Sequence, residues 1–197
     1  GLEVLETIKY LRNEMVDSRL DQIMVSLGGE LLYLGGLVAS AEEGMTRIRN
    51  AREDGSGAEY FAKMVAALGG PADFMEHRDH HLEKAAVIVP VMPEQSGYLV
   101  KMDAREIGMA LVQLGGGRTR ADQKIDYAVG FENFVDLNDY VSQQQPIALV
   151  HARTNSGAER AILNIHKACV IAEEPEKNIQ SNCVYDRIAL DQDVEED

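Results

Sequence analysis

Apolar residues recur at helical spacing in the first part of the chain, and this pattern predicts a segment made only of helices. One stripe marks a helix over residues 2–11. It consists of Leu2, Leu5, Ile8 and Leu11. Ser18 is placed to cap a second, longer helix. The apolar residues of that helix cover more than one face, so we expect it to be buried between neighbouring elements. They are Leu20, Ile23, Met24, Leu27, Leu31, Leu34 and Leu37.

Glycine pairs and capping patterns divide the rest of this segment. Gly28-Gly29 and Gly35-Gly36 each disfavour a helix, at about 1 kcal/mol per glycine. Close packing of another backbone is the expected reason, and a helix break at one pair is the alternative. Capping boxes starting at Ser40 and Ser56 predict two more helices. The first ends at Gly55, the second ends at Leu68, and a short helical turn follows over residues 73–78.

The pattern changes near Glu83, where short runs of β-branched residues begin. Strands are predicted over residues 85–92 and 98–102, with Pro90 indicating a sheet edge or a bend. A helix over residues 104–114 follows and ends at the glycines of 115–117. The remaining predicted elements are strands at 125–126, 129–131 and 146–150, a helix capped by Ser156, and a closing strand over 182–188. We expect these short strands to form a sheet that wraps the helix of 104–114 or packs on it.

This change in pattern predicts an α+β fold with a domain boundary between residues 78 and 84. The predicted domains are therefore residues 1–82 and residues 83–197. The acidic end of the chain, residues 191–197, is predicted to be disordered.

Charge and composition narrow the classes of partner. The 197 residues carry a net charge of −14, which argues against a nucleic acid or an anionic membrane as partner. No apolar run approaches the ~20 residues of a membrane span. Two cysteines make no disulfide framework and indicate a reducing compartment, hence a cytoplasmic protein. Cys169 is predicted to be a buried helix residue, and Cys183 a strand residue.

Two polar clusters are candidates for chemistry. His77, His80 and His81 stand beside Glu76 and Asp79, and histidines four residues apart on a helix can share a metal. The His-Glu-x-x-His order of a zinc protease is absent, so a solvated connector is the favoured interpretation.

The second cluster is the glycine run Gly115 to Gly117 with Arg118. Its backbone amides could bind an anion. These glycines follow a helix, however, whereas phosphate loops precede one, so a helix stop and a tight turn are favoured.

Three stretches carry a family resemblance in their order and spacing. They are Gly-Gly-Gly-Arg at 115–118, Ile-Asp-Tyr-Ala-Val-Gly-Phe at 125–131 and Pro-Ile-Ala-Leu-Val-His-Ala at 146–152. Together they resemble the C-terminal part of thymidine phosphorylase and the other pyrimidine-nucleoside phosphorylases. The start of the chain, Gly1 to Glu6, resembles a helix start in the middle of those enzymes, and Tyr185 to Ile188 resembles their end.

The resemblance implies a specific organisation and activity. Residues 1–82 would be the helical remainder of a larger α/β catalytic domain, and residues 83–197 an α/β hammerhead-like C-terminal domain. The parent enzyme would be a homodimeric pentosyltransferase of nucleoside salvage, which converts thymidine and phosphate to thymine and 2-deoxyribose 1-phosphate without a cofactor. The groups that bind phosphate and base would precede Gly1, so we expect no catalytic residue here and no activity of this chain alone.

Few site residues are implied within the chain itself. Arg118 is a candidate for the active-site cleft of the intact enzyme. Glu6, near Glu3 at a helix start, would help to hold a structural cation only in the intact enzyme. Helices meant to cover an absent sheet would expose Leu27, Leu31 and Leu34, so we expect the chain to associate through them.

A different class of function is the alternative. Lys101-Met102, together with Val141 and Pro146, is spaced like part of a biotinyl or lipoyl carrier domain. A carrier lysine lies at the tip of a tight hairpin, whereas Lys101 is predicted inside a strand. A carrier-like or non-catalytic interaction domain is therefore the rival interpretation.

Overall fold

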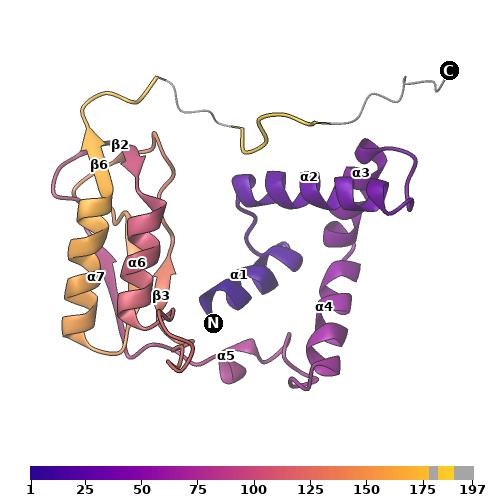
Figure 1. Ribbon diagram of the computed structural model, residues 1–197, viewed down its shortest axis with the longest axis horizontal. Helices are drawn as coiled ribbons and strands as arrows, with labels where there is room; N and C mark the ends of the chain where they lie inside the picture. The colour runs from indigo at the N-terminus through magenta and orange to yellow at the C-terminus, as the bar shows by residue number, and fades with distance from the viewer. Residues whose placement is uncertain (178–181, 189–197) are drawn as a thin grey trace. The chain divides into compact units, whose positions relative to one another are not determined.

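The computed structural model describes residues 1–177 and 182–188, which form seven helices and six strands (Figure 1). These residues divide into two compact units. The sheet unit comprises Gly1–Thr7 together with the chain from Val65 to Lys177, and the helical unit comprises Ile8–Met64 with residues 182–188.

The helical unit is centred on the contact between helices α2 (Ser18–Leu34) and α3 (Ala41–Glu53). The backbones of the two helices approach closely because each helix has a glycine at the crossing point. A Cβ at Gly29 would lie only 2.8 Å from the amide nitrogen of Met45, and a Cβ at Gly44 would collide with the backbone of Gly29. Close packing, the expected role of the Gly28-Gly29 pair, is confirmed at Gly29.

The other helices of this unit are α1 (Leu2–Leu11), of which it holds the last turn, and most of α4 (Ser56–Ala67). The three helices around Arg52 are held by a polar cluster. Arg52 pairs with Asp21 of α2 and lies 5.3 Å from the ring centroid of Tyr10, whose hydroxyl donates to Asp21 at 2.8 Å. This cluster ties α1, α2 and α3 together at a point where each contributes one side chain.

Several predicted boundaries in the helical unit are wrong by a residue or more. Asp17, and not Ser18, caps α2, since its carboxylate accepts from the amide of Leu20 at 2.7 Å. α2 ends at Leu34, because Gly35 caps it and Gly36 has a φ of +66°; the second glycine pair breaks the helix. Ser40 caps α3 as predicted, whereas Ser56 lies inside α4. Gly55 follows α3 with a φ of +81°, as a stop signal requires.

The expectation that α2 is buried between neighbours is also wrong. Within the part of the chain that the structure describes, Val25 and Gly29 are its buried residues, and a second apolar stripe on another face is exposed. The apolar residues of α2 extend over more of its surface than α3 covers.

The sheet unit contains two antiparallel sheets of three strands each. The first has the order β1 (Val87–Val91), β5 (Ala148–Ala152) and β3 (Gly130–Glu132). The second has the order β4 (Tyr140–Val141), β2 (Gly97–Met102) and β6 (Cys169–Ala172). β1 is an edge strand, as Pro90 predicts, and Pro90 pairs with Leu149.

Two helices, α6 (Ala104–Leu114) and α7 (Asn155–Ala168), pack against each other beside the strands, as Figure 1 shows. α7 contacts β5 and β1, and its buried residues complete the core. The largest core side chains are Leu99, Ile147, Ile165, Val91, Val141 and Val150. α7 thus contacts β5, β1 and β6, whereas α6, which the sequence predicted to be wrapped by a sheet or packed on one, contacts β3.

Other expectations for the sheet unit are corrected as follows. The short helix is α5 (Arg78–His81) and not 73–78, residues 125–126 are not in a strand, and β4 was not predicted. Thr154, and not Ser156, caps α7, since its hydroxyl accepts from the amide of Gly157 at 3.1 Å. α7 ends at Ala168, so Cys169 is a half-buried strand residue.

Residues 182–188, including Cys183, form no strand, and the acidic residues 191–197 lie outside the described residues. The observed mixture of helices with small antiparallel sheets agrees with the predicted α+β class. The boundary predicted between 78 and 84 stays a prediction, and the compact units instead change at residues 64 and 65.

Candidate functional site

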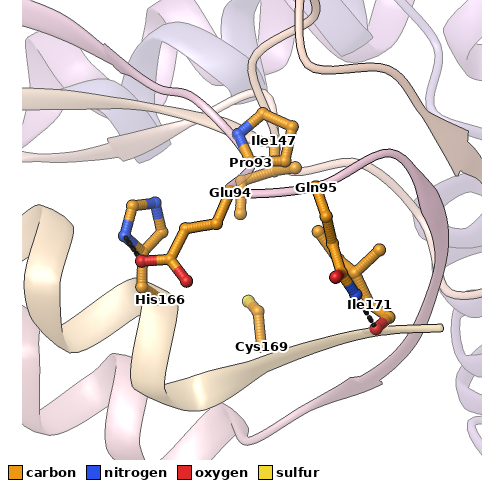
Figure 2. A pocket seen from close by; sticks show the side chains of 7 residues that line it. All are labelled: Pro93, Glu94, Gln95, Ile147, His166, Cys169 and Ile171. Atoms are coloured by element: carbon orange, nitrogen blue, oxygen red, sulfur yellow. Dashed lines mark hydrogen bonds and ion pairs between the residues drawn. The ribbon is translucent and has the colours of Figure 1, made fainter.

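A cavity of about 220 Å³ lies beside the end of α7 and is shown in Figure 2. Its wall comes from the turn after β1, from α7 and from β6, which the packing of the two sheets brings together. The lining residues are Pro93, Glu94, Gln95, Ile147, His166, Cys169 and Ile171. His166 and Glu94 lie on one side and Gln95 and Ile171 on the other, with the thiol of Cys169 between them.

The polar groups of this cavity already have structural partners. His166 donates from Nε2 to the carbonyl oxygen of Met92 at 2.9 Å, and its Nδ1 lies 3.7 Å from the carboxylate of Glu94. Gln95 donates to the carbonyl oxygen of Ile171 at 2.8 Å, which holds the turn against β6. These hydrogen bonds hold the turn after β1 against α7 and β6. No Arg or Lys side chain lines the cavity, so it has no such cation to bind a phosphate.

The thiol of Cys169 is not set up as a nucleophile. Burial raises the pKa of Cys169 and keeps the thiol protonated near neutral pH. Activation would need a base within hydrogen-bond reach, and the described contacts of His166 go to Met92 and Glu94 instead. The cavity is therefore better explained as a gap in the packing between the sheet and α7 than as a catalytic centre.

A second cavity, of about 400 Å³, lies between α6 and α7. Two arginines, Arg153 and Arg160, line it, and Asn164 donates to Gln113 across it at 3.0 Å. Among the described cavities this is the one with two cationic side chains, so it is the best candidate for an anion.

Arg153, however, is already paired with two carboxylates. It donates from Nε and Nη2 to Asp126 at 2.7 and 2.8 Å, and a third contact of 2.6 Å reaches Glu83. The hydrogen bond to Asp126, followed by that to Glu83, raises the pKa of Arg153, and the same bond lowers the pKa of Asp126. Arg153 thus ties the end of β5 to the turn at residue 126 and to the segment before β1. Arg160 remains as the cation facing this cavity, which is too little for a phosphate site.

A buried polar pair lies on the first sheet. His151 of β5 is only 8% exposed, and its Nε2 lies 3.1 Å from a carboxylate oxygen of Glu132 on the neighbouring strand β3. The pair lines an apolar cavity of about 220 Å³ with Leu2, Leu5 and Ile88. Lys84 also lines this cavity, but its ammonium group is paired with Asp79 at 2.8 Å, so it offers neither a free amine nor a free cation.

The glycine run and Arg118 form a helix stop. Gly115 has a φ of +104°, and the amides of Gly115 and Gly116 donate back to carbonyl oxygens of α6, including that of Leu111. These amides are therefore occupied and cannot bind an anion. Arg118 is exposed and donates to the carbonyl oxygen of Ala121 at 3.4 Å, outside the described cavities.

The histidine cluster is a network around one carboxylate. Asp73 lies 3.1 Å from His77 and 2.9 Å from His81, and the bond to His81 lowers the pKa of Asp73. Within residues 1–177 and 182–188, no group of three or more His, Cys, Asp or Glu side chains could hold a metal ion.

The remaining predicted residues are dispersed. Glu3 and Glu6 are both exposed on α1. Lys101 is exposed inside β2, opposite Val170 of β6, and a β-bulge lies between Leu99 and Lys101. This position, away from a hairpin tip, does not fit a swinging arm. In the described residues, no helix is long and apolar enough to cross a membrane.

Sequence reasoning missed the polar groups that the fold does bring together. Arg153, His151 and His166 received no role, because their partners lie far away in the chain: Asp126 and Glu83 for Arg153, and Met92 for His166. The apolar run around His151 was a usable signal, since a histidine inside a buried strand needs a polar partner.

Comparison with known families agrees with the sequence resemblance. Residues 98–172, from β2 to the end of β6, match the family model described as the pyrimidine nucleoside phosphorylase C-terminal domain. The matched residues include all three quoted stretches in full, and they exclude β1 and the helices before it. Residues 98–172 thus carry the C-terminal domain of the pyrimidine nucleoside phosphorylase family.

Proposed function

We propose that this chain is the C-terminal part of a thymidine or closely related pyrimidine-nucleoside phosphorylase. The parent enzyme would let phosphate attack the anomeric carbon of the nucleoside, releasing the free base and a sugar 1-phosphate. The observation that carries this proposal is the match of residues 98–172 to the C-terminal domain of that family. Residues 1–82 would then be the helical remainder of the catalytic domain, and residues 83–197 the hammerhead-like domain.

The chemistry of phosphorolysis sets what the parent must contain. Phosphate needs a site built from backbone amides with Lys, Ser or Thr side chains, and the leaving base needs donors at its carbonyl oxygens. Two arginines line a described cavity of this chain. Arg153 is paired with two carboxylates, and Arg160 is not. We therefore propose that the catalytic groups belong to another part of the parent and that this chain alone is inactive.

Other properties of the parent follow from the same family. We propose a cytoplasmic homodimer that uses phosphate and a pyrimidine nucleoside, without a cofactor. Arg118 and Glu6 stay candidates for the cleft and for a structural cation of that intact enzyme. Arg118 is exposed, with one long hydrogen bond to the carbonyl oxygen of Ala121, and this exposure supports such a role.

The coding sequence upstream of Gly1 tests the proposal. We expect it to continue in frame and to encode a glycine-rich loop with nearby Lys and Ser or Thr. The longer product should phosphorolyse thymidine or uridine, and the ratio of the two rates gives the base preference. A stop codon directly before Gly1, or a longer product without phosphorolysis, contradicts the proposal.

A further inference from the structure

The cavity beside His151 is apolar on most of its wall and contains one buried polar pair. It lies between the start of α1, the segment before β1 and the first sheet, all within the sheet unit. Its volume is about 220 Å³. The apolar residues that line it are Leu2, Leu5, Leu82, Ala85, Ile88 and Ala128. A cavity of about 150 Å³ with such walls holds benzene, so a single six-membered ring fits here.

The contact between His151 and Glu132 decides which ring nitrogen carries the proton. An ionised carboxylate only accepts hydrogen bonds, so Nε2 of His151 is the nitrogen that donates across the 3.1 Å contact. In the neutral imidazole the other nitrogen, Nδ1, is then unprotonated. Glu132 thus makes Nδ1 a hydrogen-bond acceptor.

This acceptor has no hydrogen-bond partner among the residues that the structure describes, although the His151 side chain is only 10% exposed. Buried polar atoms are nearly always hydrogen-bonded, so an unpaired one calls for a ligand or a water. Because His151 lines the cavity, its remaining surface faces the cavity. A water molecule takes up only about 30 Å³, which leaves most of the apolar space empty. A ring that carries one donor explains both the unpaired nitrogen and the apolar walls.

The charged side chains that line the cavity are paired, and this favours a neutral ligand. Lys84 is paired with Asp79, and Glu83 is paired with Arg153. We propose that the cavity binds a small neutral ring compound with one hydroxyl or N–H group, of the class of phenol, which donates to Nδ1 of His151. This inference does not rest on the proposed function, since it concerns a cavity to which that function assigns no role.

Phenol and anisole test the proposal, because both carry the same ring and only phenol has a donor. Each is added to the 197-residue chain at about pH 8, where an imidazole is ordinarily neutral, and the ring nitrogens of His151 are followed in long-range proton–nitrogen spectra. Phenol should shift the Nδ1 resonance saturably, with a dissociation constant of about 1 mM for so small a ligand. Anisole should bind about five- to tenfold more weakly, because it lacks the hydrogen bond.

Two variants and a control locate the site, with binding followed on the ligand's own resonances. His151→Phe should remove the preference for phenol over anisole, and Ala85→Met should block both by filling the cavity. His166→Phe is the matched control, since His166 lines a different cavity, and it should keep the preference.

The unchanged chain already decides the outcome, so the test does not depend on the folding of a variant. Absence of saturable phenol binding to that chain overturns the proposal, and so does equal binding of phenol and anisole. A preference that survives His151→Phe, or that His166→Phe removes equally, overturns it as well, because the hydroxyl then donates to another group.

Discussion

At the scale of single residues, Arg153 organises the region between the first sheet and the connector before it. Its guanidinium holds Asp126 with two parallel hydrogen bonds and Glu83 with another contact. Asp126 in turn accepts from the amide of Ala128 at 3.0 Å, which fixes the turn that leads into β3. One cation thus sets the positions of three chain segments that are distant in the sequence.

The Arg153–Asp126 pair predicts a specific dependence of stability on pH. The pKa of Asp126 is lower in the folded chain than its ordinary value of 3.8. The pair is therefore fully stabilising above that ordinary value, and the stabilisation is lost as the pH falls through the lower, folded value. Asp126→Asn should lower Tm by a few degrees between pH 5 and 7, and the difference from the unchanged chain should vanish in acid. A difference that persists unchanged below pH 3 would show that the ion pair is not its cause.

Burial of Cys169 makes a second prediction at this scale. Because its pKa is raised by burial, the reactive thiolate is scarcer than in a free cysteine. In a Cys183→Ser background, alkylation by iodoacetamide at pH 7.5 should be several-fold slower than that of glutathione. Urea should abolish the difference by exposing the thiol. Equal rates in the folded chain would mean that the cavity of Figure 2 opens readily to solvent.

At the scale of elements, the α2–α3 crossing depends on two glycines that face each other. Gly44→Ala should destabilise the chain by about 1–3 kcal/mol, since the new methyl group has to displace the backbone of Gly29. Gly108→Ala is the matched control inside α6, where an added Cβ meets nothing within 4 Å. It should stabilise the chain by about 0.5–1 kcal/mol, because alanine is the better helix former. Chemical denaturation measures both, and equal effects of the two substitutions would contradict the crossing.

Elements with local signals were predictable from the sequence, whereas those that depend on distant partners were not. α6 was predicted at its observed bounds, because Asp103 caps its start and Gly115 stops its end. β4 was missed, since two residues form a strand there only by pairing with Gly97 and Tyr98. β6 was taken for the end of a helix because Cys169 to Ala172 continue the apolar spacing of α7. The contacts of Arg153 and His151 were missed for the same reason, because their partners come close only when the chain folds.

At the scale of the whole molecule, the predicted domain boundary and the compact units differ, and proteolysis can separate them. We predict that residues 83–177 belong to one cooperative unit and that the first cleavage of residues 1–177 falls between 76 and 84. Residues 64 and 65, where the compact units change, lie inside α4 and are protected by its hydrogen bonds. Early cleavage inside residues 97–152 would contradict the boundary, and early cleavage within α4 would favour the compact units instead.

The central claim is that this chain carries the C-terminal domain of a pyrimidine nucleoside phosphorylase without its reaction centre. Its most direct test is a phosphorolysis assay of the 197-residue chain, at high protein concentration, with thymidine and with uridine in phosphate buffer. The account predicts no release of free base above the rate without protein, because Arg153, one of the two arginines that line the cavity between α6 and α7, is already paired with Asp126 and Glu83. Release of base above that rate, lost in Arg118→Ala, would contradict the account and place the reaction centre within these residues.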